Sequence, residues 1–245
     1  MKPATQWILG LGLAAATVYS YLVPGGANFQ NPQFARIMLF HLPCAFTSMV
    51  LLIACNWHSL KYLRTKSLIF DRKSEAAAEL CLTFIILTLL TGILFSKLQW
   101  GEWWHNDPRQ TSFLLVALMM GSTLLLRMAL QDPIKRAAST SAYNLAMLLP
   151  ILFLTFVYPR LETVKNKSLH PSSTVPAWEF SPAFGSTFLV IWAGLLVTSF
   201  WLTRMRLRAV MAQESWEDHL ERLDAGGAAA VTHMVRPVSV PSKNE

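Results

Sequence analysis

The stretch Trp100-Gly101-Glu102-Trp103-Trp104-His105-Asn106-Asp107-Pro108-Arg109-Gln110-Thr111 decides how the rest of this chain is interpreted. It holds three tryptophans, two acids, a histidine and an arginine, and a long apolar run lies on either side of it. Such a segment is too polar to cross a bilayer. Tryptophan gathers at membrane–water interfaces because its ring is apolar while its N–H is polar. The stretch is therefore either an aromatic belt around an external loop or a flat aromatic platform for a large planar ligand.

The composition indicates a membrane protein. The 245 residues are 53% hydrophobic and 14% charged, whereas soluble domains carry about 25% charged residues. The net charge of +7 comes from basic residues that fall in short clusters between apolar runs. Such clusters follow the positive-inside rule rather than the pattern of a phosphate-binding surface. This argues against nucleic acid as a partner.

The three cysteines give no sign of redox or metal chemistry. Cys44, Cys55 and Cys81 lie inside apolar runs, and none forms a C-x-x-C pair. We therefore expect small buried side chains rather than a disulfide framework or a Cys-ligated zinc site. Because C-x-x-C-H is absent as well, the chain carries no covalently attached c-type haem of its own.

Six apolar runs predict an all-α, polytopic membrane protein with six transmembrane helices. Each run is close to the ~20 residues needed to cross ~30 Å of hydrocarbon. The first resembles a secretory signal, but Pro24-Gly25-Gly26 follows it instead of a cleavage site, so we expect it to be retained. The predicted spans are residues 1–23, 36–56, 76–98, 112–130, 141–158 and 183–203.

The basic clusters predict the orientation. Residues 57–75, 131–140 and 204–208 share one side with Lys2, which places both termini in the cytoplasm. The outer face then carries the loops 24–35, 99–111 and 159–182. The predicted organisation is a membrane domain over residues 1–208 and a cytoplasmic tail over 209–245. That tail begins as a short amphipathic helix at 210–223 and is expected to be disordered from Asp224 onward.

Two histidines are expected on the outer face beside the tryptophan loop. His41 is about five residues into the second span, roughly 8 Å inward at 1.5 Å per residue. An ionisable residue inside a span is a functional hypothesis by default, although an uncharged histidine bonded to a neighbouring helix would explain it too. His170 follows Ser168-Leu169 in the loop 159–182. A lone loop histidine is usually solvated, but the topology brings this one to the same face.

Two imidazoles beside an aromatic loop predict a haem pocket. Neutral imidazole is a common iron ligand, and haem iron accepts two axial ligands from opposite sides. His41 and His170 would bind the iron, and His105 is a weaker candidate. The remaining predicted site residues are Trp100, Trp103 and Trp104 against the macrocycle, and Arg109, Arg160 or Lys165 near the propionates. Asp107 and Arg109 are expected to fix the loop across the turn that Pro108 sets. Arg127 is expected to snorkel to the inner interface.

The stretch 100–111 resembles the WWD signature of membrane haem-handling proteins, approximately W-G-x-W-W-x-W-D-x-R-x-T. Leu39-Phe40-His41-Leu42-Pro43 and Ser168-Leu169-His170 resemble elements of the CcmC type, also called haem exporter protein C. The similarity covers about residues 36–206. It implies His41 and His170 as axial ligands and adds Gly101 to the haem-binding set. Asn106 departs from the pattern, since the family has an aromatic residue there. The proline at position 108 resembles the pattern of the related CcsA-type synthetases.

The resemblance also implies a cofactor, partners and a location. Haem b would be bound non-covalently and transiently at the outer face of a bacterial inner membrane. It would pass to a CcmE-type periplasmic haem chaperone, beside CcmA/CcmB-type ABC transporter subunits and a small CcmD-type membrane protein. This favours haem transfer over classical enzyme activity. The alternatives are a haem-exporting permease subunit, a CcsA-like synthetase component, and a b-type electron carrier, which would place its histidines deep within helices.

Overall fold

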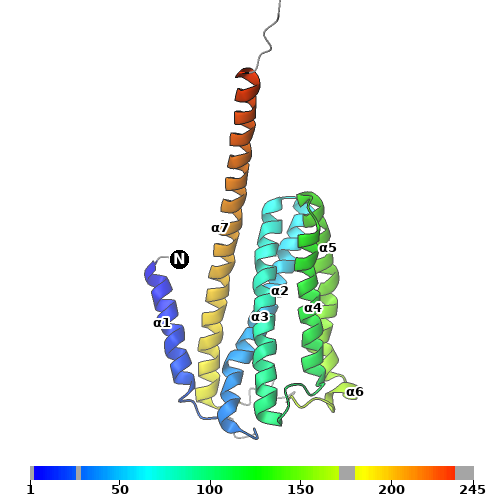
Figure 1. Ribbon diagram of the computed structural model, residues 1–245. Coiled ribbons are helices and arrows are strands. Elements are labelled where there is room, and N and C mark those ends of the chain that lie inside the picture. The colour runs from blue at the N-terminus through cyan, green and yellow to red at the C-terminus, as the bar shows by residue number, and fades with distance from the viewer. Residues whose placement is uncertain (1–2, 26–28, 171–179, 235–245) are drawn as a thin grey trace, which may run out of the picture. The chain divides into compact units, whose positions relative to one another are not determined.

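The computed structural model describes residues 3–25, 29–170 and 180–234. This part of the chain is helical and contains no strand, which confirms the predicted all-α class (Figure 1). The elements in chain order are α1 Pro3–Ser20, η1 Pro32–Ile37, α2 Met38–Thr65, α3 Leu68–Trp100, α4 Pro108–Ala129, α5 Pro133–Leu152, η2 Phe153–Val157, η3 Tyr158–Arg160, α6 Glu162–Lys165 and α7 Pro182–Met234.

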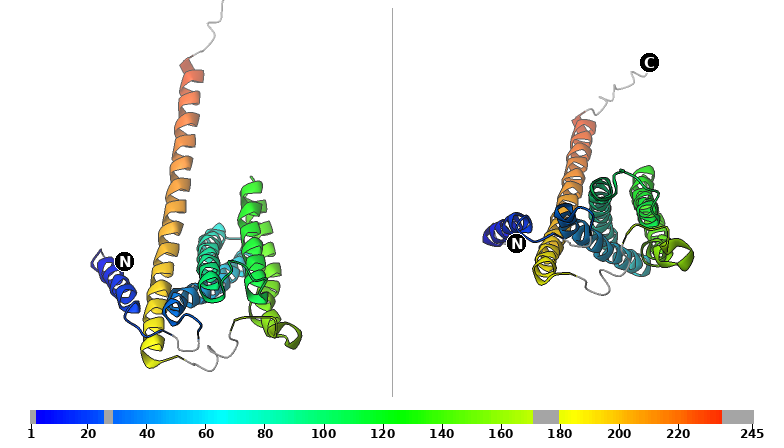
Figure 2. Two further views of the ribbon diagram at one scale, coloured as in Figure 1. Left: turned by 60° about the horizontal axis from the view of Figure 1, so that its bottom comes forward. Right: turned by 90° about the horizontal axis from the view of Figure 1, so that it is seen from below.

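Four helices form the bundle that carries the candidate site. α2 packs on α3 and α5, and α4 packs on α3 and α5, so the four helices enclose a common core. Figures 1 and 2 show them side by side from three directions. The core is built from Leu52, Cys55, Cys81, Ile85 and Val116, all almost fully buried. The three cysteines are free and buried, as predicted.

Local sequence signals set the helix ends. Lys66 follows the last residue of α2 and Gly101 follows the last residue of α3. Their φ angles of 57° and 88° place both in the left-handed conformation that closes helices. α4 and α5 each begin with an Asp-Pro pair. Asp107 and Asp132 accept hydrogen bonds from the first backbone N–H groups, and the proline that follows needs no N–H partner.

Within the described residues, five helices are long and apolar enough to cross a membrane: Pro32–Thr65, Leu68–Trp100, Pro108–Ala129, Pro133–Arg160 and Pro182–Glu217. The protein is therefore a multi-pass membrane protein. α1, with 18 residues, is not among the five, so a sixth span stays a prediction. The loop predicted at 57–75 is almost entirely helical, because α2 and α3 continue into it and leave only Lys66 and Ser67 between them.

Arg127 does not snorkel, contrary to the prediction. Its side chain is 6% exposed, and its guanidinium donates to both carboxylate oxygens of Asp71, at 2.7 and 2.9 Å. It also donates to Glu75 at 2.9 Å and to Thr140 at 3.1 Å. The acids lie one turn apart on α3, so they present a paired anionic surface to α4. That surface pairs with both terminal nitrogens of the guanidinium inside the bundle.

The chain divides into two compact units, residues 1–204 and 205–245. Within the first unit, Phe184, Phe188 and Ile191 of α7 pack in one apolar cluster with Leu39 and Phe95. In the second unit, α7 continues to Met234, past Asp224, where disorder was expected to begin. Residues 228–230 are alanines, the strongest helix formers. The rest of the predicted disordered segment, 235–245, lies outside the described residues.

Candidate functional site

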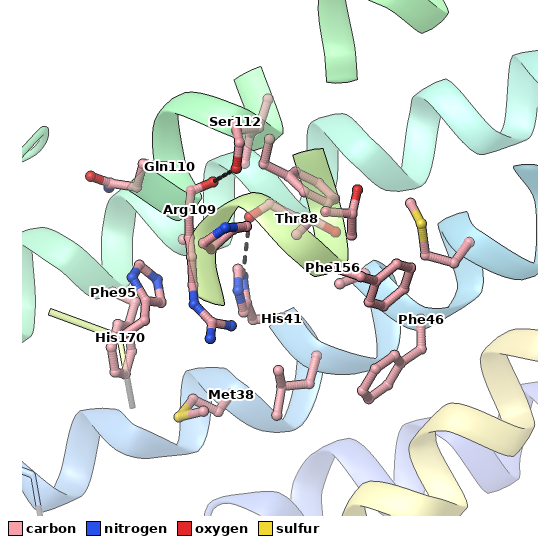
Figure 3. Close-up of a pocket in the computed structure, with 18 of the residues that line it drawn as sticks. Met38, His41, Phe46, Thr88, Phe95, Arg109, Gln110, Ser112, Phe156 and His170 are labelled. Carbon is pink, nitrogen blue, oxygen red and sulfur yellow. Dashed lines mark hydrogen bonds between the residues drawn. The ribbon is translucent and has the colours of Figure 1, made fainter. Parts of the chain in front are cut away.

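A cavity of about 270 Å³ lies at one end of the four-helix bundle. It is bounded by the first turns of α2, the last turns of α3, the first turns of α4 and the segment 155–160 (Figure 3). Most of its lining is apolar, with Met38, Phe46, Phe95, Phe113 and Phe156 contributing the large side chains. Four basic residues interrupt this lining, namely His41, Arg109, Arg160 and His170.

His41 reaches the cavity from the first turn of α2 and leans on α3. Its Nδ1 lies 3.1 Å from the backbone oxygen of Thr88 and 3.1 Å from Oγ1 of Thr91. The contact with Thr88 is visible in Figure 3. A Cβ atom at Gly92 would lie 3.0 Å from Cε1 of this imidazole, so the ring packs directly on the helix backbone. His41 therefore makes the contact with a neighbouring helix that was one explanation for it, and it also lines the cavity, so its role as a ligand stays a prediction.

His170 is brought to the same cavity by the aspartate of the tryptophan loop. Its Nδ1 lies 3.0 Å from Oδ1 of Asp107. The other carboxylate oxygen of Asp107 accepts from the backbone N–H of Leu169 at 2.6 Å and from the hydroxyl of Ser168 at 3.0 Å. Since Oδ1 also accepts from the backbone N–H of Arg109 at 2.8 Å, one carboxylate joins two loops about sixty residues apart in sequence.

The electrostatics at Asp107 favour its charged form. The carboxylate is buried, and burial alone would raise its pKa. The contact with His170, the charge of that ring and the backbone N–H groups of Arg109 and Leu169 outweigh burial and hold the pKa of Asp107 well below its usual range. Asp107 is therefore a fixed negative charge beside His170.

The tryptophans of the loop divide into two groups. Trp100 packs inward, with its ring centroid 5.2 Å from that of His170 and 5.5 Å from that of Phe95. Trp103 is 56% exposed, and Lys97 Nζ lies 5.9 Å from its ring centroid. Trp104 donates from Nε1 to Oδ1 of Asn106 at 3.0 Å. The described residues that line the cavity do not include Trp103, Trp104 or Gly101, and Gly101 is exposed.

The cationic candidates also separate. Figure 3 shows Arg109 extending into the cavity that His41 and His170 line. Arg160 lines the same cavity from η3. One of its guanidinium nitrogens donates to the Phe156 carbonyl at 2.8 Å. Lys165 instead pairs with Glu162 at 2.6 Å on α6. His105 lies with its ring centroid 6.0 Å from Trp100 and its Nδ1 3.6 Å from Glu102, and it is not among the described lining residues.

Sequence reasoning missed the wall formed by residues 153–160. Residues 153–157 form a π-helical turn between Pro150 and Pro159, and Thr155, Phe156 and Pro159 line the cavity. Each proline lacks a backbone N–H, which disturbs regular hydrogen bonding, and π-turns occur frequently at functional sites. The spacing of the two prolines at the end of an apolar run is the signal that could have indicated this wall.

Comparison with known proteins agrees with the motifs. The sequence pattern of the family CcmC, described as Heme exporter protein C, matches residues 1–222. A Heme exporter protein C of Paracoccus denitrificans is 27% identical over 221 residues, which cover 85% of this chain and 90% of that protein. The protein of the same name from Escherichia coli is 27% identical over 82% of this chain and 76% of its own length. That from Bradyrhizobium diazoefficiens is 32% identical over 154 residues, and this match spans only 56% of its length. The chain belongs to the CcmC family.

Proposed function

We propose that the cavity binds haem at the outer face of the membrane, with His41 and His170 as the two axial ligands. The protein then delivers the haem to a periplasmic haem chaperone of the CcmE type during maturation of c-type cytochromes. One observation carries this proposal: two histidines that are far apart in sequence line one cavity. Nδ1 of His41 contacts the Thr88 carbonyl, and Nδ1 of His170 contacts the Asp107 carboxylate.

The residues present fit the chemistry of haem. Two imidazoles supply nitrogen ligands for iron, and two guanidinium groups, Arg109 and Arg160, can pair with two propionates. Phe46, Phe95 and Phe156 offer apolar contact to a macrocycle. Trp100 and Asp107 act indirectly, because they contact His170 rather than the open cavity.

The position of the cavity favours transfer over translocation. Its lining comes from the first turns of α2 and α4 and the last turns of α3, which meet at the end of the bundle that carries the tryptophan loop. Its volume of about 270 Å³ is just below the roughly 300–1,000 Å³ typical of small-molecule pockets. A large planar ligand held there keeps part of its surface accessible, which suits a protein that hands its cargo to another.

The family to which the chain belongs supports a role in haem handling for cytochrome c biogenesis, as the name Heme exporter protein C indicates for its relatives. We infer that the bound cargo is haem b, held non-covalently, and that the protein resides in a bacterial inner membrane. The partners we propose are a CcmE-type chaperone, CcmA/CcmB-type transporter subunits and a CcmD-type small membrane protein.

The test is the visible absorption spectrum of the purified protein after haem is supplied. We expect a Soret band typical of low-spin haem in the wild type, which is lost or shifted in both His41→Ala and His170→Ala. His58→Ala is the matched control, because this histidine stacks on Phe70 near the opposite end of the bundle. A wild type that binds no haem, or equal spectra for all three variants, would refute the proposed function.

A further inference from the structure

The contacts of His41 define which of its nitrogens carries hydrogen. Neutral imidazole has one N–H donor and one lone-pair acceptor, and its tautomer is read from the partners of each nitrogen. Nδ1 of His41 lies 3.1 Å from the carbonyl oxygen of Thr88, which can only accept. Nδ1 therefore has to be the donor.

The hydroxyl of Thr91 supports the same assignment. Its oxygen lies 2.8 Å from the Leu87 carbonyl and 3.1 Å from the Thr88 carbonyl, so its single hydrogen is directed to the backbone of α3. The hydroxyl oxygen then presents a lone pair to Nδ1 of His41, also at 3.1 Å. Both neighbours of Nδ1 are acceptors.

Gly92 makes this approach possible. It is the glycine of α3 whose missing side chain faces the imidazole, because a Cβ atom there would lie 3.0 Å from Cε1 and 3.5 Å from Nδ1 of His41. A contact of 3.0 Å between carbon atoms is shorter than the ~3.5–4.0 Å optimum. A side chain at this position would therefore require the ring to move away from α3 by a few tenths of an ångström, which would lengthen its hydrogen bonds.

We propose that the Thr88 carbonyl, the Thr91 hydroxyl and Gly92 form a seat on α3 that holds the His41 imidazole with hydrogen on Nδ1 and leaves Nε2 as the ligand nitrogen. Thr91 and Gly92 are positioning residues, since they act on the cargo through His41. The inference rests on the proposed function for its consequence at the iron, while the seat itself is a property of the chain alone.

The seat has a consequence for the bound metal. A ligating histidine whose other N–H is donated to an oxygen acceptor has a fixed ring orientation and is a more basic ligand. A more basic ligand favours the ferric state of haem. Loss of the Thr91 hydroxyl should therefore raise the midpoint potential of the bound haem, while haem remains bound.

The first experiment compares Thr91→Val, Thr91→Ser and Thr83→Val by redox titration of the haem-loaded, full-length protein. Valine keeps the shape of threonine but removes the hydroxyl, and serine restores it. Thr83 is the matched control, because it lies on the same helix and makes the same back-bond, to Glu79 at 2.9 Å, but is exposed. We expect a raised potential for Thr91→Val only. Equal potentials for Thr91→Val and wild type would overturn the proposed effect at the iron.

The second experiment needs no haem. In protein labelled with ¹⁵N-histidine, the His41 signals, assigned by their loss in His41→Ala, report which nitrogen is protonated. We expect the Nδ1–H form, and an Nε2–H form would overturn the seat. A wild type in the Nδ1–H form that binds no haem would support the seat and refute the proposed function, so the two failures are distinguishable.

The glycine provides a third comparison. Gly92→Ala should weaken haem binding by about 10–100-fold, the usual effect of disturbing a partner of a metal ligand. Gly121→Ala on α4 is the control, because a Cβ atom there would meet nothing within 4 Å. Equal haem affinity in the two variants would contradict a role for Gly92.

Discussion

Asp107 links the tryptophan loop to the segment that carries His170. Its carboxylate caps α4, accepts from Ser168 and Leu169, and contacts Nδ1 of His170. We expect Asp107→Ala to release the segment before His170 and to lower haem affinity by about 10–100-fold, because a histidine that loses its oriented partner is a poorer ligand. Haem titration monitored at the Soret band measures this effect.

Asp132→Ala is the control that distinguishes the loss of a helix cap from the loss of a partner of His170. Asp132 precedes Pro133 as Asp107 precedes Pro108, and it accepts from the backbone N–H groups of Ile134 and Lys135 at 2.9 and 2.8 Å. Each alanine variant loses a helix cap worth about 0.5–2 kcal/mol. Haem binding should be unchanged in Asp132→Ala, and a loss as large as that of Asp107→Ala would show that helix stability alone explains the effect.

The local sequence was informative about these residues but not about their directions. His41, His170 and Arg109 were predicted from residue type and topology, and the structure brings all three to one cavity. The exposure of Trp103 could not be predicted from residue type, because Trp100, three positions earlier, packs against His170 instead. Asn106, which departs from the family pattern, has φ 51°, a conformation that asparagine tolerates better than most residues.

At the scale of elements, an ion pair joins α3 and α4 away from the cavity. Arg127 is bonded to both oxygens of Asp71 and to Glu75, all within 2.9 Å. We expect Arg127→Met to lower the free energy of unfolding by up to about 3–5 kcal/mol, because the buried Asp71 carboxylate loses both hydrogen bonds from Arg127 and keeps only Arg72, at 3.5 Å, as a cation. Thermal unfolding in detergent, followed by circular dichroism, measures this change.

The double variant Arg127→Met/Asp71→Leu tests the reason for that loss. Replacing both members of a buried pair with apolar residues is often neutral or stabilising. We expect the double variant to recover most of the lost stability, with Glu75 still 3.6 Å from Arg72. A double variant as unstable as the sum of the two single variants would show that the charges themselves are not the cause.

The starts of α4 and α5 were predicted too late. The Asp-Pro pairs at 107–108 and 132–133 are local signals for both starts, but the predicted spans began at 112 and 141 because they followed the apolar runs alone. The helical character of residues 57–75 was missed because a cluster of basic residues reads as a loop between apolar runs. Two of these lysines lie over aromatic rings of the same helical region. Nζ of Lys61 is 5.1 Å from the ring centroid of Trp57, and Nζ of Lys73 is 5.4 Å from that of Phe70.

At the scale of the whole molecule, delivery of haem requires a surface that a second protein can reach. Trp103 is exposed on the tryptophan loop and is not among the described lining residues of the cavity. We expect Trp103→Ala to bind haem as the wild type does but to transfer it more slowly to a CcmE-type chaperone, measured as haem absorbance on the separated acceptor. Trp57→Ala, at a tryptophan that is 54% exposed on α2 near its far end, should transfer at the wild-type rate. Loss of haem binding in Trp103→Ala would contradict this division of roles.

The fate of α1 decides how many times the chain crosses the membrane. Its 18 residues extend about 27 Å at 1.5 Å per residue, close to the ~30 Å of hydrocarbon. Ala16 of α1 belongs to the same apolar cluster as Phe188 and Ile191 of α7. Leu13 of α1 packs so close to Gly194 of α7 that a Cβ atom there would contact its side chain. α1 therefore lies along the part of α7 that is long and apolar enough to span, which supports the sixth span predicted from the sequence.

Because the native cysteines are buried, single introduced cysteines can test this topology in intact cells with a membrane-impermeant maleimide. Thr5 is exposed near the start of α1, and a spanning α1 places it in the cytoplasm, so Thr5→Cys should react only after the membrane is opened. Glu102→Cys, on the exposed tryptophan loop, should react from outside, and Gln131→Cys, between α4 and α5, should not. If Thr5→Cys reacts in intact cells as readily as Glu102→Cys, α1 does not cross, and the chain has the odd number of spans that the five long helices alone provide.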